Sequence, residues 1–169
     1  TLIFASVLIL VALGGCFAEH SGVINLGLEG IMIMGALGGA LTMRYVPNTA
    51  PAIVMLLAVI VVSALVGMVY SCLLAVASIN FKADQTLVGT ALNLLGTAGA
   101  TVIVKAINTA ANPDDVSSIV QYGGAKSALL VSIGSFEFNW FMLVAFIALV
   151  FAYVTLYKTR FGLRLMACG

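Results

Sequence analysis

A polar, glycine-rich stretch interrupts the apolar N-terminal part of the chain between Glu19 and Gly30. Ionisable side chains at membrane depth are costly and usually face a protein interior or a water-filled cavity. Glycines weaken a continuous helix, and non-helical backbone at this depth is tolerated only where protein or such a cavity surrounds it. Broken helices of this kind often form the substrate sites of transporters. The stretch therefore predicts a broken helix beside a transport path, with the candidate pathway residues Asn25, Gly27, Glu29 and Gly30.

A helix that restarts near Leu26 would have Asn25 as its N-cap and Glu29 in its first turn or just beyond. The helix dipole favours a negative charge at that place. The alternative is that the charged residues of this stretch sit at a membrane surface and mark a short loop, and the sequence leaves both interpretations open. A phosphate-binding loop is excluded, because no Lys-Ser or Lys-Thr pair follows the glycines.

A second polar feature is a stripe of side chains that recur every three or four residues along a later apolar segment. Residues with this spacing lie along one side of a single helix. They either hydrogen-bond to a neighbouring helix or border a polar path, and both interpretations turn the stripe inward. In the second case Thr90, Asn93 and Thr97 are candidate pathway residues. The stripe comprises Thr86, Thr90, Asn93, Thr97, Thr101 and Lys105.

The composition places these features in a membrane protein. The 169 residues are 63% hydrophobic and only 8% charged, whereas a soluble domain carries about 25% charged residues. The net charge of +1 and the absence of a basic run argue against a nucleic-acid partner. The three cysteines and the single histidine have no metal-ligand or nucleophile spacing. We therefore expect no metal site, no cofactor and no catalytic residue.

The elements that must position the polar features are apolar segments long enough to approach or cross a bilayer. They predict an all-α fold, a polytopic transmembrane bundle with about five membrane segments, one of them broken or re-entrant. We take residues 1–169 as a single transmembrane domain, the N-terminal part of a longer protein. A glycine pair, Gly35 and Gly39, favours close helix packing in the second segment. The expected segments are Thr1–Ala18, the irregular Ser21–Met43, Ala52–Ala77, Gln85–Val104 and Phe138–Tyr157.

Basic residues orient the segments, because positively charged loops stay in the cytoplasm. Lys158, Arg160 and Arg164 follow the last span, which predicts a cytoplasmic segment over 158–169. Counting back, residues 108–137 form an extracytoplasmic loop, with a short helix or strand at Ala128–Ile133. The connection from Ser78 to Asp84 then lies inside and the turn at Pro47–Pro51 outside. The side on which the chain begins depends on whether residues 21–43 span or re-enter.

With these residues in view, the chain resembles the permease subunits of ABC importers for branched-chain amino acids, ribose and nucleosides. Its closest likeness within that group is to the shorter permease of nucleoside or "simple sugar" systems. Ala18–Met32 is similar to the group's ERSGVVNIGLEGMM signature, and Asp84–Leu95 to its NQVVSGLALNLL helix. Thr159–Gly169 is similar to its TRFGLRLRAVGE segment. Two departures are His20 and Met166, each standing where the group usually has Arg.

The resemblance implies a bacterial plasma or inner membrane protein that pairs with a second permease. A lipoprotein or periplasmic protein delivers the substrate, and a separate cytoplasmic ATPase supplies the energy. The permease docks on that ATPase through a short coupling helix. The residues of 158–169 suit such a helix, because apolar and basic side chains each repeat at a spacing of four. The candidate coupling residues are Arg160, Phe161, Gly162, Arg164 and Leu165; an ordinary positive-inside anchor is the alternative.

The expected function is therefore that of a transport subunit rather than an enzyme, moving nucleosides across the membrane. One alternative is an ABC permease for branched-chain amino acids or simple sugars, which would differ in a few pocket side chains. An alternative of another class is an ATP-independent channel or secondary transporter, in which Glu29 would bind an ion.

Overall fold

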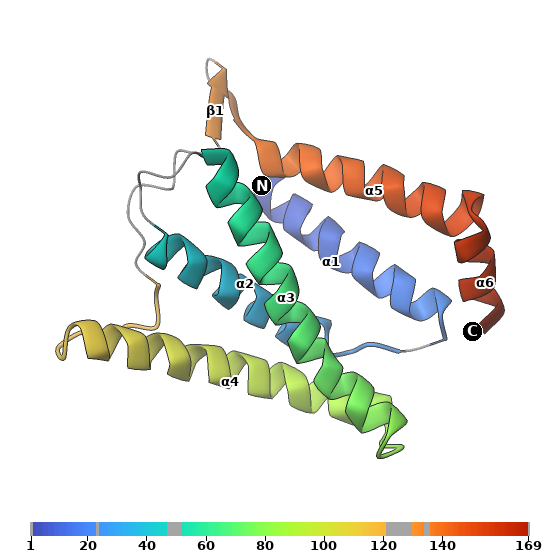
Figure 1. Cartoon of the computed structure of the whole chain (residues 1–169), viewed down its shortest axis with the longest axis horizontal. Coiled ribbons are helices and arrows are strands. Elements are labelled where there is room, and N and C mark those ends of the chain that lie inside the picture. Colours follow the sequence, from blue (N-terminus) through green and yellow to red (C-terminus); the bar gives the residue numbers. More distant parts are fainter. Residues whose placement is uncertain (1, 23, 47–51, 121–129, 134–135, 169) are drawn as a thin grey trace. The chain divides into compact units, whose positions relative to one another are not determined.

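The computed structural model describes residues 2–22, 24–46, 52–120, 130–133 and 136–168. Among them are six helices and one two-stranded hairpin (Figure 1). The chain divides into two compact units, residues 1–25 with 127–169 and residues 26–126. The helices are α1 (Leu2–His20), α2 (Leu28–Tyr45), α3 (Ala52–Ile79), α4 (Gln85–Ala111), α5 (Trp140–Lys158) and α6 (Arg160–Cys168), and the strands are β1 (Leu130–Ile133) and β2 (Phe136–Asn139).

In the unit of residues 26–126, α2 packs between α3 and α4. Its glycines allow a close approach to α3: a Cβ at Gly35 would lie 3.3 Å from the Ser63 carbonyl oxygen, and one at Gly39 only 2.5 Å from the Ser63 hydroxyl. This confirms the packing role predicted for the glycine pair. Tyr70, Leu74 and Leu92 form the buried apolar cluster of this unit, with Ile31, Met34 and Val88 packed against it.

Helices α2 and α4 run parallel, because residues near the start of each are in contact and so are residues near the end of each. Gly30 meets Asn93 at the N-terminal end of the pair, and Arg44 meets Asn108 at the C-terminal end. Helix α3 runs antiparallel to α2, since Gly67 packs on Ile31 while Gly39 packs on Val59.

In the other unit, α1 and α5 run parallel. The His20 ring meets the Tyr157 ring edge to face at 6.2 Å near the C-terminal ends of the two helices. Ser6 and Ile9 of α1 line a recess with Met142 and Phe146 of α5 near the opposite ends. The antiparallel hairpin, which pairs Leu130 with Asn139 and Ile133 with Phe136, leads into α5.

By length and composition, two of the described helical segments can cross a membrane, Ile53–Ile79 and Gln85–Ala111. Met142–Lys158 and Arg160–Ala167, bent by 70°, make a third if they are counted as one span. Ala5–His20 is a shorter apolar helix. Each of the five expected membrane segments overlaps a helix, although the segment Ser21–Met43 is helical only from Leu28. The crossing of the bilayer by the remaining helices stays a prediction.

Several predicted boundaries were wrong. Helix α4 continues to Ala111, so the loop expected over 108–137 begins four residues later, because Lys105 extends from the helix without ending it. Phe138 and Asn139 belong to β2, and α5 begins at Trp140. The element expected at Ala128–Ile133 is a strand over its described part. The turn expected at Pro47–Pro51 lies outside the described residues.

Candidate functional site

A side chain of another helix hydrogen-bonds to the backbone at the break before α2. Helix α2 begins at Leu28 with Gly27 at its N-cap position, and no side chain of that position caps it. The Asn93 side chain of α4 takes over this role: its Oδ1 accepts from the Gly30 backbone N–H at 2.7 Å, and its Nδ2 donates to the Leu26 carbonyl at 2.8 Å. The first backbone N–H groups of a helix need such partners. Asn93 therefore supplies hydrogen-bond partners to the backbone on both sides of the start of α2.

The expected N-cap at Asn25 was wrong, because the helix starts two residues later than the sequence pattern suggested. Asn25 is half-buried in the non-helical connection before α2. Glu29 does lie in the first turn of α2, where its side chain is exposed. Its carboxylate thus has the favourable dipole position that was predicted. Gly27 and Gly30 are both buried.

Glycines bring the backbones of α2 and α4 together around Asn93. A Cβ at Gly30 would lie 2.6 Å from the Leu92 carbonyl oxygen, and one at Gly96 would lie 2.9 Å from the Gly30 Cα. The Tyr70 hydroxyl of α3 donates to the same Leu92 carbonyl at 2.6 Å. Three helices therefore meet at one point, and two of them touch through backbone atoms that leave no room for a side chain.

The threonines of the stripe behave differently from Asn93. Thr90 donates to the Thr86 and Leu87 carbonyls, and Thr97 donates to the Asn93 carbonyl. These bonds lie within α4, and both threonine side chains are exposed. Of the two roles proposed for the stripe, bonding to a neighbouring helix thus belongs to Asn93. The exposed threonines are left able to border a polar space.

A second polar contact, which the sequence analysis missed, joins the C-terminal ends of α2 and α4. Arg44 donates to the Asn108 Oδ1 at 2.6 Å, and the Asn108 Nδ2 donates to the carbonyls of Ser117 at 3.0 Å and Ile119 at 2.9 Å. The Asn108 side chain is only 2% exposed. Asn108 follows Lys105 by three residues, so the spacing of the stripe could have been extended to include it.

Asp115 fixes the chain that follows α4. The hydroxyl and the backbone N–H of Ser117 hold the pKa of the Asp115 carboxyl below its usual range, and the positive charge of Arg44 adds to this effect. At the other end of α4, Asp84 is the N-cap. The backbone N–H groups of Leu87 and Thr86 donate to its carboxylate and lower the pKa of Asp84.

Between the two asparagine contacts lies a hollow of about 360 Å³. Helix α2 contributes Ile33, Ala36, Leu37 and Ala40, α4 contributes Thr97, Ala100, Thr101 and Val104, and the segment after α4 contributes Ser118 and Val120. None of these ten described lining residues is charged.

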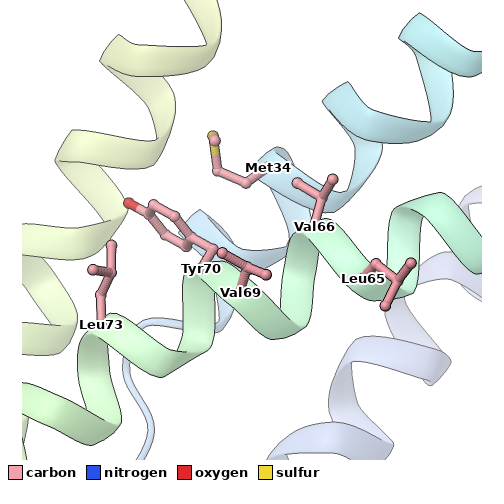
Figure 2. Close-up of a pocket in the computed structure, with 6 residues that line it drawn as sticks. All are labelled: Met34, Leu65, Val66, Val69, Tyr70 and Leu73. Carbon is pink, nitrogen blue, oxygen red and sulfur yellow. The ribbon is translucent and has the colours of Figure 1, made fainter.

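A separate recess of about 320 Å³ opens between α2 and α3 (Figure 2). Its walls are the apolar side chains Met34, Leu65, Val66, Val69 and Leu73 together with Tyr70, whose hydroxyl already donates to Leu92. Such walls offer a polar solute no hydrogen-bond partner, so this recess is a poor candidate for a substrate site.

Helix α6 presents the basic residues of the C-terminal segment on its exposed side. Arg160, Phe161 and Arg164 are exposed, whereas Leu165 is half-buried. The exposed apolar residue on the other flank of the arginines is Leu163, at 66%, which the sequence analysis did not select. Phe161 and Leu163 lie between the two arginines in the sequence, and around the helix axis they lie on either side of them.

Gly162 has a different role, because it allows the bend between α5 and α6. It is buried, and a side chain there would overlap the carbonyl oxygens of Thr155 and Leu156. The Thr159 hydroxyl donates to the Thr155 carbonyl at 2.5 Å and accepts from the Gly162 N–H at 3.4 Å. Within the described residues, no group of three or more His, Cys, Asp or Glu side chains could hold a metal ion.

Comparison with known proteins gives relatives along the whole chain. The chain is 36% identical over 175 residues to the guanosine ABC transporter permease protein NupQ of Bacillus subtilis, and the match covers 100% of this chain and 54% of that protein. It is 32% identical over 171 residues to the nucleoside ABC transporter permease protein NupC of Lactococcus lactis, covering 99% and 54%.

A putative glucose ABC transporter permease protein of Haloferax volcanii, TsgC13, is 37% identical over 97 residues, which cover 55% of this chain and 26% of that protein. The chain thus spans about half the length of the relatives that it matches from end to end. No solved structure matches it. The family model of the branched-chain amino acid transport system / permease component matches residues 1–169, and the chain belongs to this family.

Proposed function

We propose that this chain is part of the membrane subunit of an ATP-driven importer that moves nucleosides into a bacterial cell. The observation that carries the proposal is α6, a helix that exposes two arginines together with Phe161 and Leu163 and is turned 70° from the apolar helix before it. A short helix with this surface suits docking into a groove of a partner protein. In this proposal the partner is a cytoplasmic ABC ATPase, and Gly162 and Thr159 set the angle at which the helix meets it.

The directions of the helices support one arrangement in the membrane. If α6 is cytoplasmic, the C-terminal end of α5 is cytoplasmic, and so is that of α1, which runs parallel to α5. Lys82 favours a cytoplasmic start of α4, and α2, which runs parallel to α4, would then cross outward. The two units, taken separately, require the same alternation, with the 21–27 connection inside and the chain beginning outside. We therefore propose that α2 spans the bilayer after the break rather than re-entering.

Nucleosides are the proposed substrates because two of the relatives matched along the whole chain are named for guanosine and nucleosides. A second permease subunit and a substrate-binding lipoprotein or periplasmic protein complete the proposed assembly. Sugar import is the alternative that a comparison favours, through the shorter match to the putative glucose permease.

Uptake of labelled guanosine tests the substrate assignment. Cells with the intact parent gene should accumulate guanosine in an ATP-dependent way, and cells without the gene should lose this uptake. Unlabelled ribose or leucine in excess should not compete. Equal guanosine uptake with and without the gene would contradict nucleoside import, and competition by ribose would favour the sugar alternative.

Charge reversal tests the coupling helix. Arg160→Glu with Arg164→Glu should reduce ATP-dependent uptake by at least tenfold, because both charges lie on the exposed side of α6. Uptake and the amount of subunit in the membrane are measured together. Lys105→Glu, an exposed charge reversal on α4, serves as the control. Normal uptake in the double variant would remove α6 from the ATPase interface.

A further inference from the structure

The hollow between α2 and α4 has the volume and the lining of a small-molecule site. Its volume of about 360 Å³ lies within the usual range of small-molecule pockets, about 300–1,000 Å³. Its α2 and α4 walls carry the small side chains Ala36, Ala40 and Ala100. Small residues on facing helices normally let the helices close on each other. Here a space remains between them.

An asparagine contact lies at each end of the hollow. Asn93 joins the helices at one end of the hollow and Asn108 joins them at the other. The two residues are 15 positions apart on α4, which corresponds to about 22 Å along the helix. Both ends of this part of the helix pair are therefore joined by hydrogen bonds.

The wall beyond α4 is positioned by the same asparagine. Asn108 donates to the carbonyls of Ser117 and Ile119, and the alternate residues Ser118 and Val120 line the hollow. One face of this short segment is therefore anchored while the other closes the space.

The lining combines hydroxyl groups with apolar walls and carries no charge. Thr97 and Thr101 donate to carbonyls of their own helix at 2.9 Å and 2.8 Å, which leaves oxygen lone pairs as acceptors. The apolar wall includes Ile33, Leu37 and Val104. A zwitterionic amino acid would bring two charges without a partner in the lining, which is costly. A simple sugar would leave the apolar wall unused.

We propose that this hollow binds an uncharged nucleoside, with the base against the apolar wall and donor groups of the solute on Thr97 and Thr101. This inference rests on the proposed function and adds a site to it. It also distinguishes two groups of threonines in the stripe, since Thr97 and Thr101 line the hollow while Thr86 and Thr90 do not.

The test uses the intact parent subunit in its assembled transporter. Thr97→Val and Thr101→Val each remove a hydroxyl and keep the side-chain shape. The KM for guanosine uptake should rise about 2- to 10-fold in each variant, which corresponds to the loss of one ordinary hydrogen bond. The maximal rate should change little. Ser71→Ala removes an exposed hydroxyl of α3 outside the hollow and should leave the KM unchanged.

A direct measurement accompanies the kinetics. Thr101→Cys is made in a parent subunit in which every other cysteine, Cys16, Cys72 and Cys168 among them, is replaced by serine, and its reaction with a small thiol reagent is followed. Guanosine should slow the reaction, and leucine should not. An unchanged KM in both valine variants together with no protection, in a transporter that still imports guanosine, would overturn the site alone. Absence of guanosine uptake by the unaltered transporter would overturn the proposed function and this site with it.

Discussion

The two ends of the α2–α4 pair are joined by the same type of side chain in different ways. At the N-terminal end, Asn93 bonds to backbone groups of the break, and glycine backbones pack around it. At the C-terminal end, Asn108 bonds to the long side chain of Arg44 and to the chain that follows α4. The partners of Asn93 are backbone atoms in closely packed helices, whereas those of Asn108 are a flexible side chain and a short loop. We infer a rigid N-terminal end and an adaptable C-terminal end.

The largest expected effect comes from filling the glycine crossing at the rigid end. Gly96→Val should lower the free energy of unfolding by about 3 kcal/mol, because the new side chain meets the Gly30 backbone and neither helix can shift without breaking the Asn93 bonds. Thermal unfolding of the purified subunit in detergent measures the change. Gly99→Val is the matched control on the same helix, since a Cβ there meets nothing within 4 Å. Equal stability of the two variants would show that the crossing is looser than described.

Removal of the Asn93 amide should have the next largest effect. Asn93→Leu leaves the Gly30 N–H and the Leu26 carbonyl without their partner, which costs about 2 kcal/mol when such groups are shielded from water. The same unfolding measurement applies. Asn93→Asp keeps an acceptor for Gly30 and should recover part of the loss. A leucine variant as stable as the unaltered subunit would mean that the start of α2 is set by other contacts.

The corresponding change at the adaptable end should cost less. Asn108→Leu should lower the free energy of unfolding by about 1 kcal/mol, because the half-buried Arg44 can turn to water and the leucine keeps an apolar contact in a buried place. Arg44→Lys should cost less again, since lysine keeps the charge. If Asn108→Leu proves more destabilising than Asn93→Leu, the assignment of the rigid and adaptable ends is reversed.

The smallest expected effect is that of acidification on local stability, and it involves an aspartate near each end of α4. Hydrogen bonds lower the pKa of Asp84 and of Asp115 in the folded state. Their stabilising contribution is therefore present above the ordinary carboxyl pKa of about 4 and is lost as the pH falls through the lower folded-state pKa. Hydrogen-exchange protection at Thr86 and Leu87, and at Ser117, should decrease in that acidic range. Asp84→Asn should remove the pH dependence at Thr86 and Leu87 only, and a dependence that persists there would exclude Asp84 as its source.

The sequence predicted the parts of this region that depend on local pattern. The break before α2 and the helical side shared by Thr90, Asn93 and Thr97 follow from glycine content and spacing. What Asn93 contacts does not follow from them, because the partner backbone lies more than 60 positions away in the chain. The expected N-cap at Asn25 was wrong for the same reason: the local rule assigns the cap to a nearby side chain, and here another helix supplies it.

The C-terminal end of the α2–α4 pair illustrates a second limit of prediction from the sequence. Asn108 was placed in a loop because the charge of Lys105 was taken to mark the end of the membrane helix, and so its buried contacts were missed. The spacing of Arg160, Phe161 and Arg164 predicted a short helix, which α6 confirms, while their coupling role stays a prediction. The choice between Leu163 and Leu165 depended on the packing of α6 against α5, which spacing alone does not give.

Hydrogen exchange of the intact subunit, comparing Asn93→Leu with Asn108→Leu, tests the difference between the two ends most directly. In the first variant, exchange should increase over residues 28–31 and stay unchanged over 115–120. In the second, it should increase over 115–120 and leave the first turn of α2 protected. An increase over residues 28–31 in both variants would contradict the account, because the two ends of the α2–α4 pair would then not be held independently.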